Sequence, residues 1–182
     1  MNYGSAVKGV VEDHIKNMDA LDAQEKELQE QVRQERITGR VAAEKRKEIE
    51  DKRAVAITTA QQKIRELHQQ HDEAVDRWDM PEGSKLTDDA KLLAVDFPMN
   101  EAQFQAFCDK YRNNSVMLRL LAQYADKHEG LYAFRPEDAT VRKAEFADYC
   151  ERAAGCIRNH NTLQAAMFLD QRYVNPAVTY EY

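Results

Sequence analysis

The stretch ERITGRVAAEK, residues 35–45, interrupts about seventy residues that otherwise favour one continuous helix. Gly39 costs a helix roughly 1 kcal/mol relative to alanine, and β-branched Ile37 and Thr38 just before it lower helix propensity further. Glycine is also the preferred residue where a helix ends in a left-handed conformation. The stretch therefore predicts that the chain turns back near Gly39 to form an antiparallel helical hairpin, with a continuous helical rod as the alternative.

Apolar residues before this stretch recur at alternating spacings of four and three, which is typical of a coiled coil. This stripe, which we call the seam, continues in phase beyond Gly39, where charged residues and alanines occupy many of its positions. A turn at Gly39 would bring Leu28 near Ile49 and place Glu25 beside Arg53. Two helices alone would leave apolar surface uncovered, so either the C-terminal part or a second copy of the chain must cover it. Self-association is the more economical interpretation, and we expect a dimer or a larger oligomer formed through Val7, Val11, His14, Met18, Leu21, Leu28, Val32, Ile49 and Leu67.

Composition changes near Trp78. Residues 1–77 contain one aromatic side chain, Tyr3, whereas the other aromatic residues and all four prolines lie from Trp78 onward. The second part can therefore close a compact core, and its pattern is helical throughout, which predicts an all-α protein. We expect a coiled-coil hairpin over residues 1–79, a linker over 80–86, a small helical bundle over 87–172 and an extended tail over 173–182.

Helix-start signals divide the expected bundle. Thr87 precedes one short helix, and Asn100 with Gln103 has the spacing of a capping box at the start of the next. The segment KYRNNSVMLRLL, residues 110–121, then places a short turn between two helices, which is compatible with a helix-turn-helix. A DNA-binding regulator is therefore the alternative function, although this part of the chain is net acidic; its reading residues would be Asn114, Ser115, Arg119 and Gln123.

The sequence contains no motif that names a reaction, so we expect no enzyme activity and no cofactor. His68 and His71 lie one helical turn apart, but a metal site needs three or four ligands and no further histidine is in register. The three cysteines, Cys108, Cys150 and Cys156, form no CxxC pair and read as buried apolar residues. We therefore expect no metal site.

Partners and location follow from charge and hydropathy. The net charge of −6 does not favour nucleic acid, and no apolar run is long enough to span a membrane. The N-terminus lacks the apolar stretch of a secretory signal, so we expect the protein in the cytoplasm or in a particle assembled there. The aromatic end RYVNPAVTYEY is a candidate partner contact through Tyr173, Pro176, Tyr180 and Tyr182.

The charged N-terminal half, the junction WDMPEGSKLTDDAKLLA and the segment NNSVMLRLLAQYADKH together resemble small helical proteins of tailed phages and prophages of gut bacteria. The resemblance is greatest over about residues 75–128. Some of these proteins are encoded among head-assembly genes, and no chemistry is attached to their motifs. The resemblance implies a scaffold-like or minor virion component in a host cell or a virion, with a coat or head protein as a possible partner.

Overall fold

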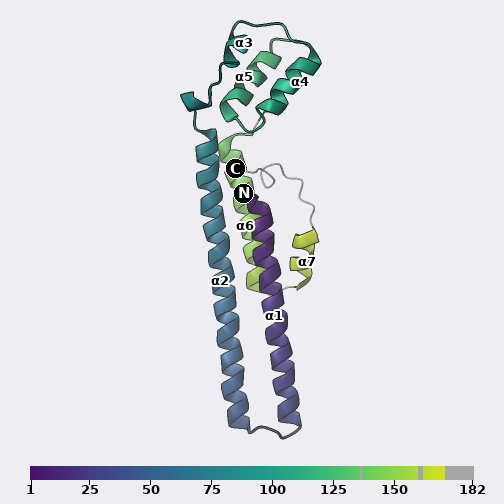
Figure 1. The fold of residues 1–182 in the computed structure, drawn as a ribbon. Coiled ribbons are helices and arrows are strands. Elements are labelled where there is room, and N and C mark those ends of the chain that lie inside the picture. Colours follow the sequence, from purple (N-terminus) through teal and green to yellow (C-terminus); the bar gives the residue numbers. More distant parts are fainter. Residues whose placement is uncertain (136, 160–161, 171–182) are drawn as a thin grey trace. The chain divides into compact units, whose positions relative to one another are not determined.

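The computed structural model describes residues 1–135, 137–159 and 162–170, and every secondary-structure element in them is a helix. The all-α class predicted from the sequence is confirmed. In chain order the elements are α1 (Tyr3–Arg33), α2 (Gly39–Asp79), the 3-10 helix η1 (Gly83–Lys85), α3 (Ala90–Ala94), α4 (Glu101–Lys110), α5 (Ser115–Ala125), α6 (Ala139–Asn159) and α7 (Thr162–Asp170), as shown in Figure 1.

The two long helices α1 and α2 run antiparallel and are joined by a short turn (Figure 1). The predicted hairpin is therefore confirmed, and the continuous rod is wrong. The turn is a Schellman motif: the Arg36 N–H donates to the Gln31 carbonyl and the Glu35 N–H donates to the Val32 carbonyl, each at 3.0 Å. Glu35 has the left-handed conformation that this motif requires, with φ of 54°.

Gly39 has a different role from the expected one. It is the first residue of α2, whereas Glu35 provides the left-handed residue of the turn. The Thr38 hydroxyl accepts a 3.5 Å hydrogen bond from the Val41 N–H, so the start of α2 is capped by a side chain. The helix break is thus made by the whole 34–38 segment rather than by the glycine.

The seam packs the two hairpin helices together. Met18, Leu21, Leu28, Ala42 and Ile49 form a buried cluster along it. Beside this cluster the predicted pair forms, because Arg53 donates to Glu25 and also to Asp22, each at 2.7 Å.

The seam leaves its predicted phase further along α2. The alternating spacing of four and three, continued along α2 through Ala56 and Ala60, reaches Lys63 as the next inward position. In the structure Lys63 is exposed, and Ile64 is buried instead. An uninterrupted helix of 3.6 residues per turn drifts away from a strict seven-residue repeat, which accounts for the slip.

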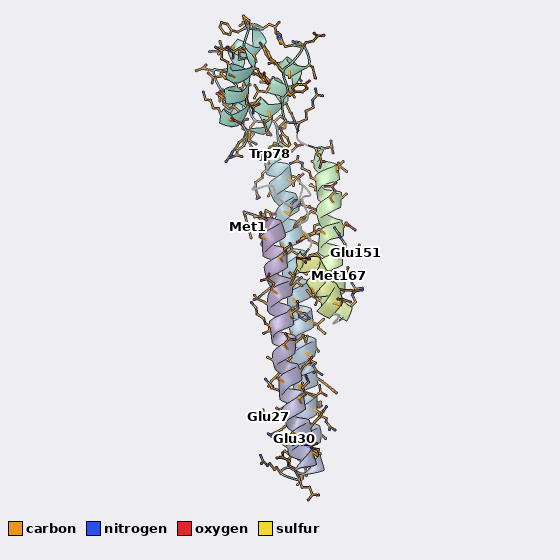
Figure 2. All side chains as sticks on the ribbon, turned by 90° about the vertical axis from the view of Figure 1, so that its right-hand side faces the viewer. Met1, Glu27, Glu30, Trp78, Glu151 and Met167 are labelled. Atoms are coloured by element: carbon orange, nitrogen blue, oxygen red, sulfur yellow. The ribbon has the colours of Figure 1, made fainter. Side chains whose placement is uncertain are left out.

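The C-terminal helices cover one side of the hairpin (Figures 1 and 2). Phe146 of α6 stacks on His71 at 3.9 Å between ring centroids, and the Tyr149 hydroxyl donates to the Gly4 carbonyl at 3.4 Å. Helix α7 contacts α1, where Lys8 donates to the Leu169 carbonyl at 3.1 Å. On this side, therefore, the chain's own helices α6 and α7 cover the hairpin's apolar surface, which is one of the two covers that the sequence left open.

The chain divides into two compact units. One, the hairpin unit, contains residues 1–71 together with the described residues 144–159 and 162–170; the other, the small unit, contains the described residues between Asp72 and Lys143. This division differs from the expected one, in which all helices after residue 87 belonged to one bundle.

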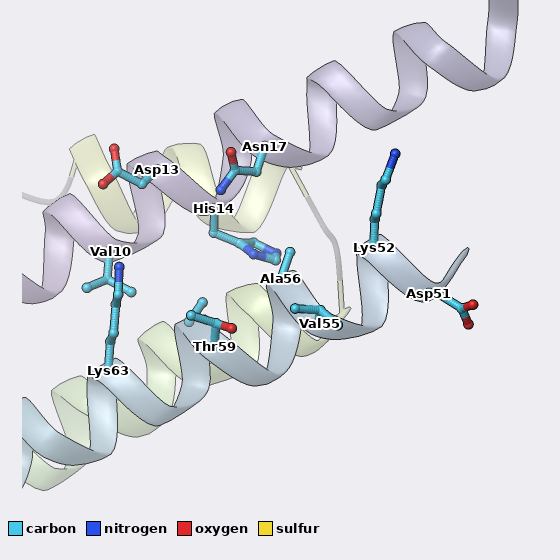
Figure 3. A pocket seen from close by; sticks show the side chains of 11 residues that line it. Val10, Asp13, His14, Asn17, Asp51, Lys52, Val55, Ala56, Thr59 and Lys63 are labelled. Carbon is cyan, nitrogen blue, oxygen red and sulfur yellow. The ribbon is translucent and has the colours of Figure 1, made fainter. Parts of the chain in front are cut away.

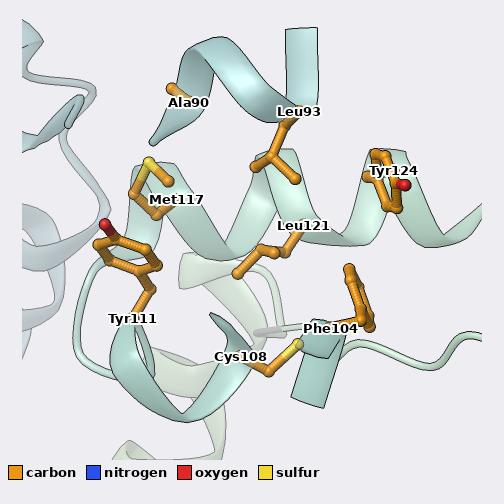
Figure 4. Packing of buried hydrophobic residues seen from close by; sticks show 8 residues of the cluster. All are labelled: Ala90, Leu93, Phe104, Cys108, Tyr111, Met117, Leu121 and Tyr124. Carbon is orange, nitrogen blue, oxygen red and sulfur yellow. The ribbon is translucent and has the colours of Figure 1, made fainter. Parts of the chain in front are cut away.

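The small unit is built from short, well-capped helices around one core. Asn100 and Gln103 form the predicted capping box at the start of α4. Thr87 does not cap α3, since that helix begins at Ala90 and Thr87 instead donates to the Tyr111 hydroxyl at 3.0 Å. Figure 4 shows the core, which consists of Ala90, Leu93, Phe104, Cys108, Tyr111, Met117, Leu121 and Tyr124.

Candidate functional site

A hollow lies on the face of the hairpin between α1 and α2 (Figure 3). We call it the hairpin groove. Its volume is about 430 Å³, and in Figure 3 the helices α6 and α7 lie behind it, on the other side of the hairpin. It is lined by Val10, Asp13, His14 and Asn17 from α1 and by Asp51, Lys52, Val55, Ala56, Thr59, Ala60 and Lys63 from α2.

The groove exists because α2 has small side chains where α1 has larger ones. Ala56 and Ala60 stand opposite the part of α1 that carries His14, so the two helices leave an apolar floor between them. Val55 lies beside this floor and is 65% exposed. Contiguous exposed apolar surface, rather than a single exposed residue, is a feature of surfaces that bind other proteins, and Val55 adjoins the apolar floor of the groove.

A second hollow of about 210 Å³ continues along the hairpin and shares Lys52 with the groove. It is lined by Gln24, Glu27, Leu28, Gln31, Lys45, Glu48, Ile49 and Lys52. On α1 the positions 17, 24 and 31 are seven residues apart, as are 45, 52 and 59 on α2. Residues seven apart lie nearly above one another on a helix. The two hollows therefore belong to one continuous face of the hairpin.

The two helices contribute opposite charges to this face. From α1 come the acidic residues Asp13 and Glu27, without a basic residue. From α2 come Lys45, Lys52 and Lys63, together with the acidic residues Glu48 and Asp51. The face thus has an acidic edge on α1 and a mostly basic edge on α2, with apolar residues between them.

The predicted self-association residues lie mainly in the protein's own interior. Their side chains pack within the hairpin unit, and among them only His14, Leu28 and Ile49 also line the two hollows of the groove face. Val7, Val11, His14, Met18, Leu21, Leu28 and Ile49 are buried, while Val32 and Leu67 are half-buried. Self-association itself stays a prediction, and most of its contacts would have to come from other residues of the hairpin.

The proposed DNA-reading residues are mostly engaged inside the small unit. Asn114 caps α5 and also donates to the Lys85 carbonyl at 2.7 Å. Ser115 is buried and donates to the Trp78 carbonyl, and Arg119 pairs with Asp79, each at 2.5 Å. Gln123 is exposed and lines a hollow of about 470 Å³ between α3 and α5. Reading DNA with the first three side chains would require these contacts to break.

His71, Tyr149 and Cys156 of the hairpin unit are buried among side chains of the core. His71 packs edge-on to Tyr3, with 5.6 Å between ring centroids, in addition to its stacking on Phe146. Burial raises the pKa of Tyr149 to about 12 and also raises the pKa of the Cys156 thiol. A raised thiol pKa keeps the cysteine protonated and unreactive at neutral pH.

The described residues contain neither a metal site nor a membrane-spanning helix. In residues 1–135, 137–159 and 162–170, no group of three His, Cys, Asp or Glu side chains could hold a metal ion. None of the helices described there has the length and apolar character needed to cross a membrane. The predicted contact residues Tyr173, Pro176, Tyr180 and Tyr182 lie outside the described residues.

Comparisons with known proteins add no family. No protein-family model, curated protein or solved structure matches the chain. No residue role is therefore carried over from another protein.

The sequence pattern missed the groove face. Residues 45, 52 and 59 repeat at seven-residue spacing, and so do 48, 55 and 62, but most of these positions are charged or polar. A search for apolar stripes therefore passes over them. The signal that could have found this face is the combination of alanines on the inner side of α2 with an exposed Val55 beside them.

Proposed function

We propose that this protein is a non-enzymatic assembly protein that associates with other copies of itself through the exposed face of its N-terminal hairpin. Tailed-phage particle assembly is the context, in the host cytoplasm or in the virion. The role is that of a scaffold-like or minor virion component, and a coat or head protein is its further partner. DNA regulation is the alternative function.

The observation that carries the proposal is the open hairpin groove. One side of the hairpin is covered by α6 and α7, whereas the groove face presents an apolar floor, an exposed Val55 and edges of opposite charge. Surfaces with an apolar centre and a polar rim are typical of protein–protein contacts. The phage context rests on the resemblance of the junction and of the α5 region to small phage and prophage proteins.

Light scattering of the purified full chain after size-exclusion chromatography tests this role. At tens of micromolar protein we expect a mass above that of one chain. The fraction of chains in the associated form should fall on dilution, as mass action requires. A strictly monomeric chain over that range would contradict the proposal.

A gel-shift series at increasing salt separates the alternative. Binding through phosphate contacts weakens steeply with salt, so a specific complex that survives physiological salt would favour the DNA-binding regulator. We expect no such complex, because Asn114, Ser115 and Arg119 already make contacts within the chain.

A further inference from the structure

We infer that the groove face binds the groove face of a second copy, with the two hairpins parallel, so that α1 of each copy lies against α2 of the other. This inference rests on the proposed self-association and deepens it, because it names the surface and the arrangement. The occupant of the groove is thus a second copy of this chain.

The open side of the hairpin is long enough for a stable dimer. Helix α1 has 31 residues, which at 1.5 Å per residue is roughly 46 Å. Two helices side by side, each about 10 Å across, give a face of roughly 900 Å². Standard protein–protein interfaces bury about 800 Å² per partner, so the face has the area that a specific dimer needs.

Charge selects among the two-fold arrangements of such a dimer. If the two-fold axis runs along the hairpin, the copies are parallel and α1 of one faces α2 of the other. If the axis lies in the interface at right angles to the helices, the copies are antiparallel. In that arrangement α1 faces the α1 of the second copy, and α2 faces its α2. The first arrangement sets the acidic α1 edge against the mostly basic α2 edge, whereas the second sets like charges together.

The lengthwise axis also fixes which residues meet. A two-fold rotation about this axis leaves each residue at the same height along the hairpin. A residue of α1 therefore faces, in the second copy, the α2 residue that stands across the hairpin from it within one chain. Asp13 and Lys63 line the same hollow, as do Asn17 and Thr59. We therefore expect Asp13 to lie opposite the partner's Lys63, and Asn17 opposite the partner's Thr59. Isologous symmetry makes each pair occur twice.

Disulfide crosslinking tests the arrangement directly. An Asn17→Cys chain that carries an affinity tag is mixed with an untagged Thr59→Cys chain, and the mixture is oxidised. We expect a crosslinked product that contains one chain of each kind, and little product from either variant alone. The wild-type chain is the control for the native cysteines, all three of which are buried.

Charge reversal tests the same contacts without cysteine. Lys52→Glu with Lys63→Glu places acidic residues on both edges, and we expect the dimer dissociation constant to rise about tenfold or more. Asp13→Lys with Glu27→Lys should act likewise, and all four changes together should restore dimerisation. Lys47→Glu with Arg65→Glu is the matched control, because it changes the net charge equally at exposed positions that do not line either hollow.

The outcomes separate this inference from the proposed function. Suppose that the chain is dimeric by light scattering, but that crosslinks form only between two Asn17→Cys chains or do not form. This result would overturn the arrangement and leave self-association standing. A control pair that weakens the dimer as much as the groove pair also overturns it. A strictly monomeric wild-type chain overturns both.

Discussion

The hairpin unit and the small unit reach a buried core in opposite ways. The hairpin unit uses two long helices with a narrow seam of aliphatic side chains and alanines, and its aromatic residues come mostly from α6 and α7, far along the chain. The small unit uses short helices, side-chain caps and a core whose residues all lie within one stretch of chain.

This contrast shows that a change in composition is not a unit boundary. All aromatic residues except Tyr3 lie from Trp78 onward. Three of them, Phe146, Tyr149 and Phe168, nevertheless belong to the hairpin unit. Tyr149 and Phe168 lie 4.9 Å apart between ring centroids. The bulky residues that the two hairpin helices lack are therefore provided by α6 and α7, which follow the core of the small unit in the sequence.

Removing one large core residue from each unit should give the largest effects. Phe146→Ala should lower the free energy of unfolding by roughly 3–5 kcal/mol and Leu121→Ala by roughly 2–5 kcal/mol, because both residues are fully buried. Far-ultraviolet ellipticity reports mainly α1 and α2, whereas fluorescence of Trp78, the only tryptophan, reports the small unit.

The two probes can break the comparison between the units. We expect Phe146→Ala to shift the urea midpoint of ellipticity more than that of fluorescence, and Leu121→Ala to do the reverse. If both probes shift together in both variants, the two units unfold as one cooperative body and the contrast does not extend to their stability.

A pair of substitutions in the hairpin turn should have smaller effects. Glu35→Gly should stabilise the protein by about 0.5–1 kcal/mol, because Glu35 is left-handed and glycine adopts that conformation without steric cost. Gly39→Ala should be neutral or stabilise by up to about 1 kcal/mol, since an added Cβ meets no atom within 4 Å and Gly39 is helical. Thermal unfolding of the two variants measures both.

The small unit offers the matched control for this turn. Asp96 ends α3 in the same kind of motif, with φ of 55°, and Phe97 donates to the Leu92 carbonyl at 3.0 Å. Aspartate tolerates the left-handed region better than glutamate, so Asp96→Gly should gain less than Glu35→Gly. A loss of stability in Gly39→Ala with no gain in Glu35→Gly would mean that the glycine makes the turn.

The smallest effect on stability is expected from the titration of Tyr149, which changes stability only at alkaline pH. Its pKa is raised from the ordinary 10.0 to about 12, first by burial. Because the folded pKa exceeds the unfolded one, the stability that this group contributes is complete below pH 10.0 and is lost as the pH rises toward about 12. Urea midpoints over this range should fall less in Tyr149→Phe than in the wild type, whereas Tyr132→Phe, at an 83% exposed position, should keep the wild-type slope.

Much of the hairpin could be predicted from local signals. The seam spacing identified most of the buried residues of α1, and the antiparallel fold-back placed Glu25 beside Arg53, where the structure has an ion pair. The pair holds the pKa of Arg53 above its ordinary value, chiefly through the hydrogen bond with Glu25. The predicted role of Gly39 was wrong because Glu35 is the left-handed residue of the turn, and the N–H groups of Glu35 and Arg36 make the two backbone hydrogen bonds of the Schellman motif.

The candidate site was less predictable than the hairpin. Groove residues such as Lys52 and Thr59 are polar, and their shared face emerges only when α1 and α2 are side by side. The DNA-reading interpretation failed to foresee that Ser115 and Arg119 would contact the end of α2, because those contacts join residues 37 and 40 positions apart.

By itself, the sequence determined the helical class, the fold-back between residues 33 and 39, and the inward stripe of α1, since periodicity and helix-breaking residues act over a few neighbours. Tertiary structure decided that α6 and α7 rather than another molecule cover one side of the hairpin, and that the opposite side keeps a groove with edges of opposite charge. Burial of a helix face depends on which distant segment reaches it, and no local pattern carries that information.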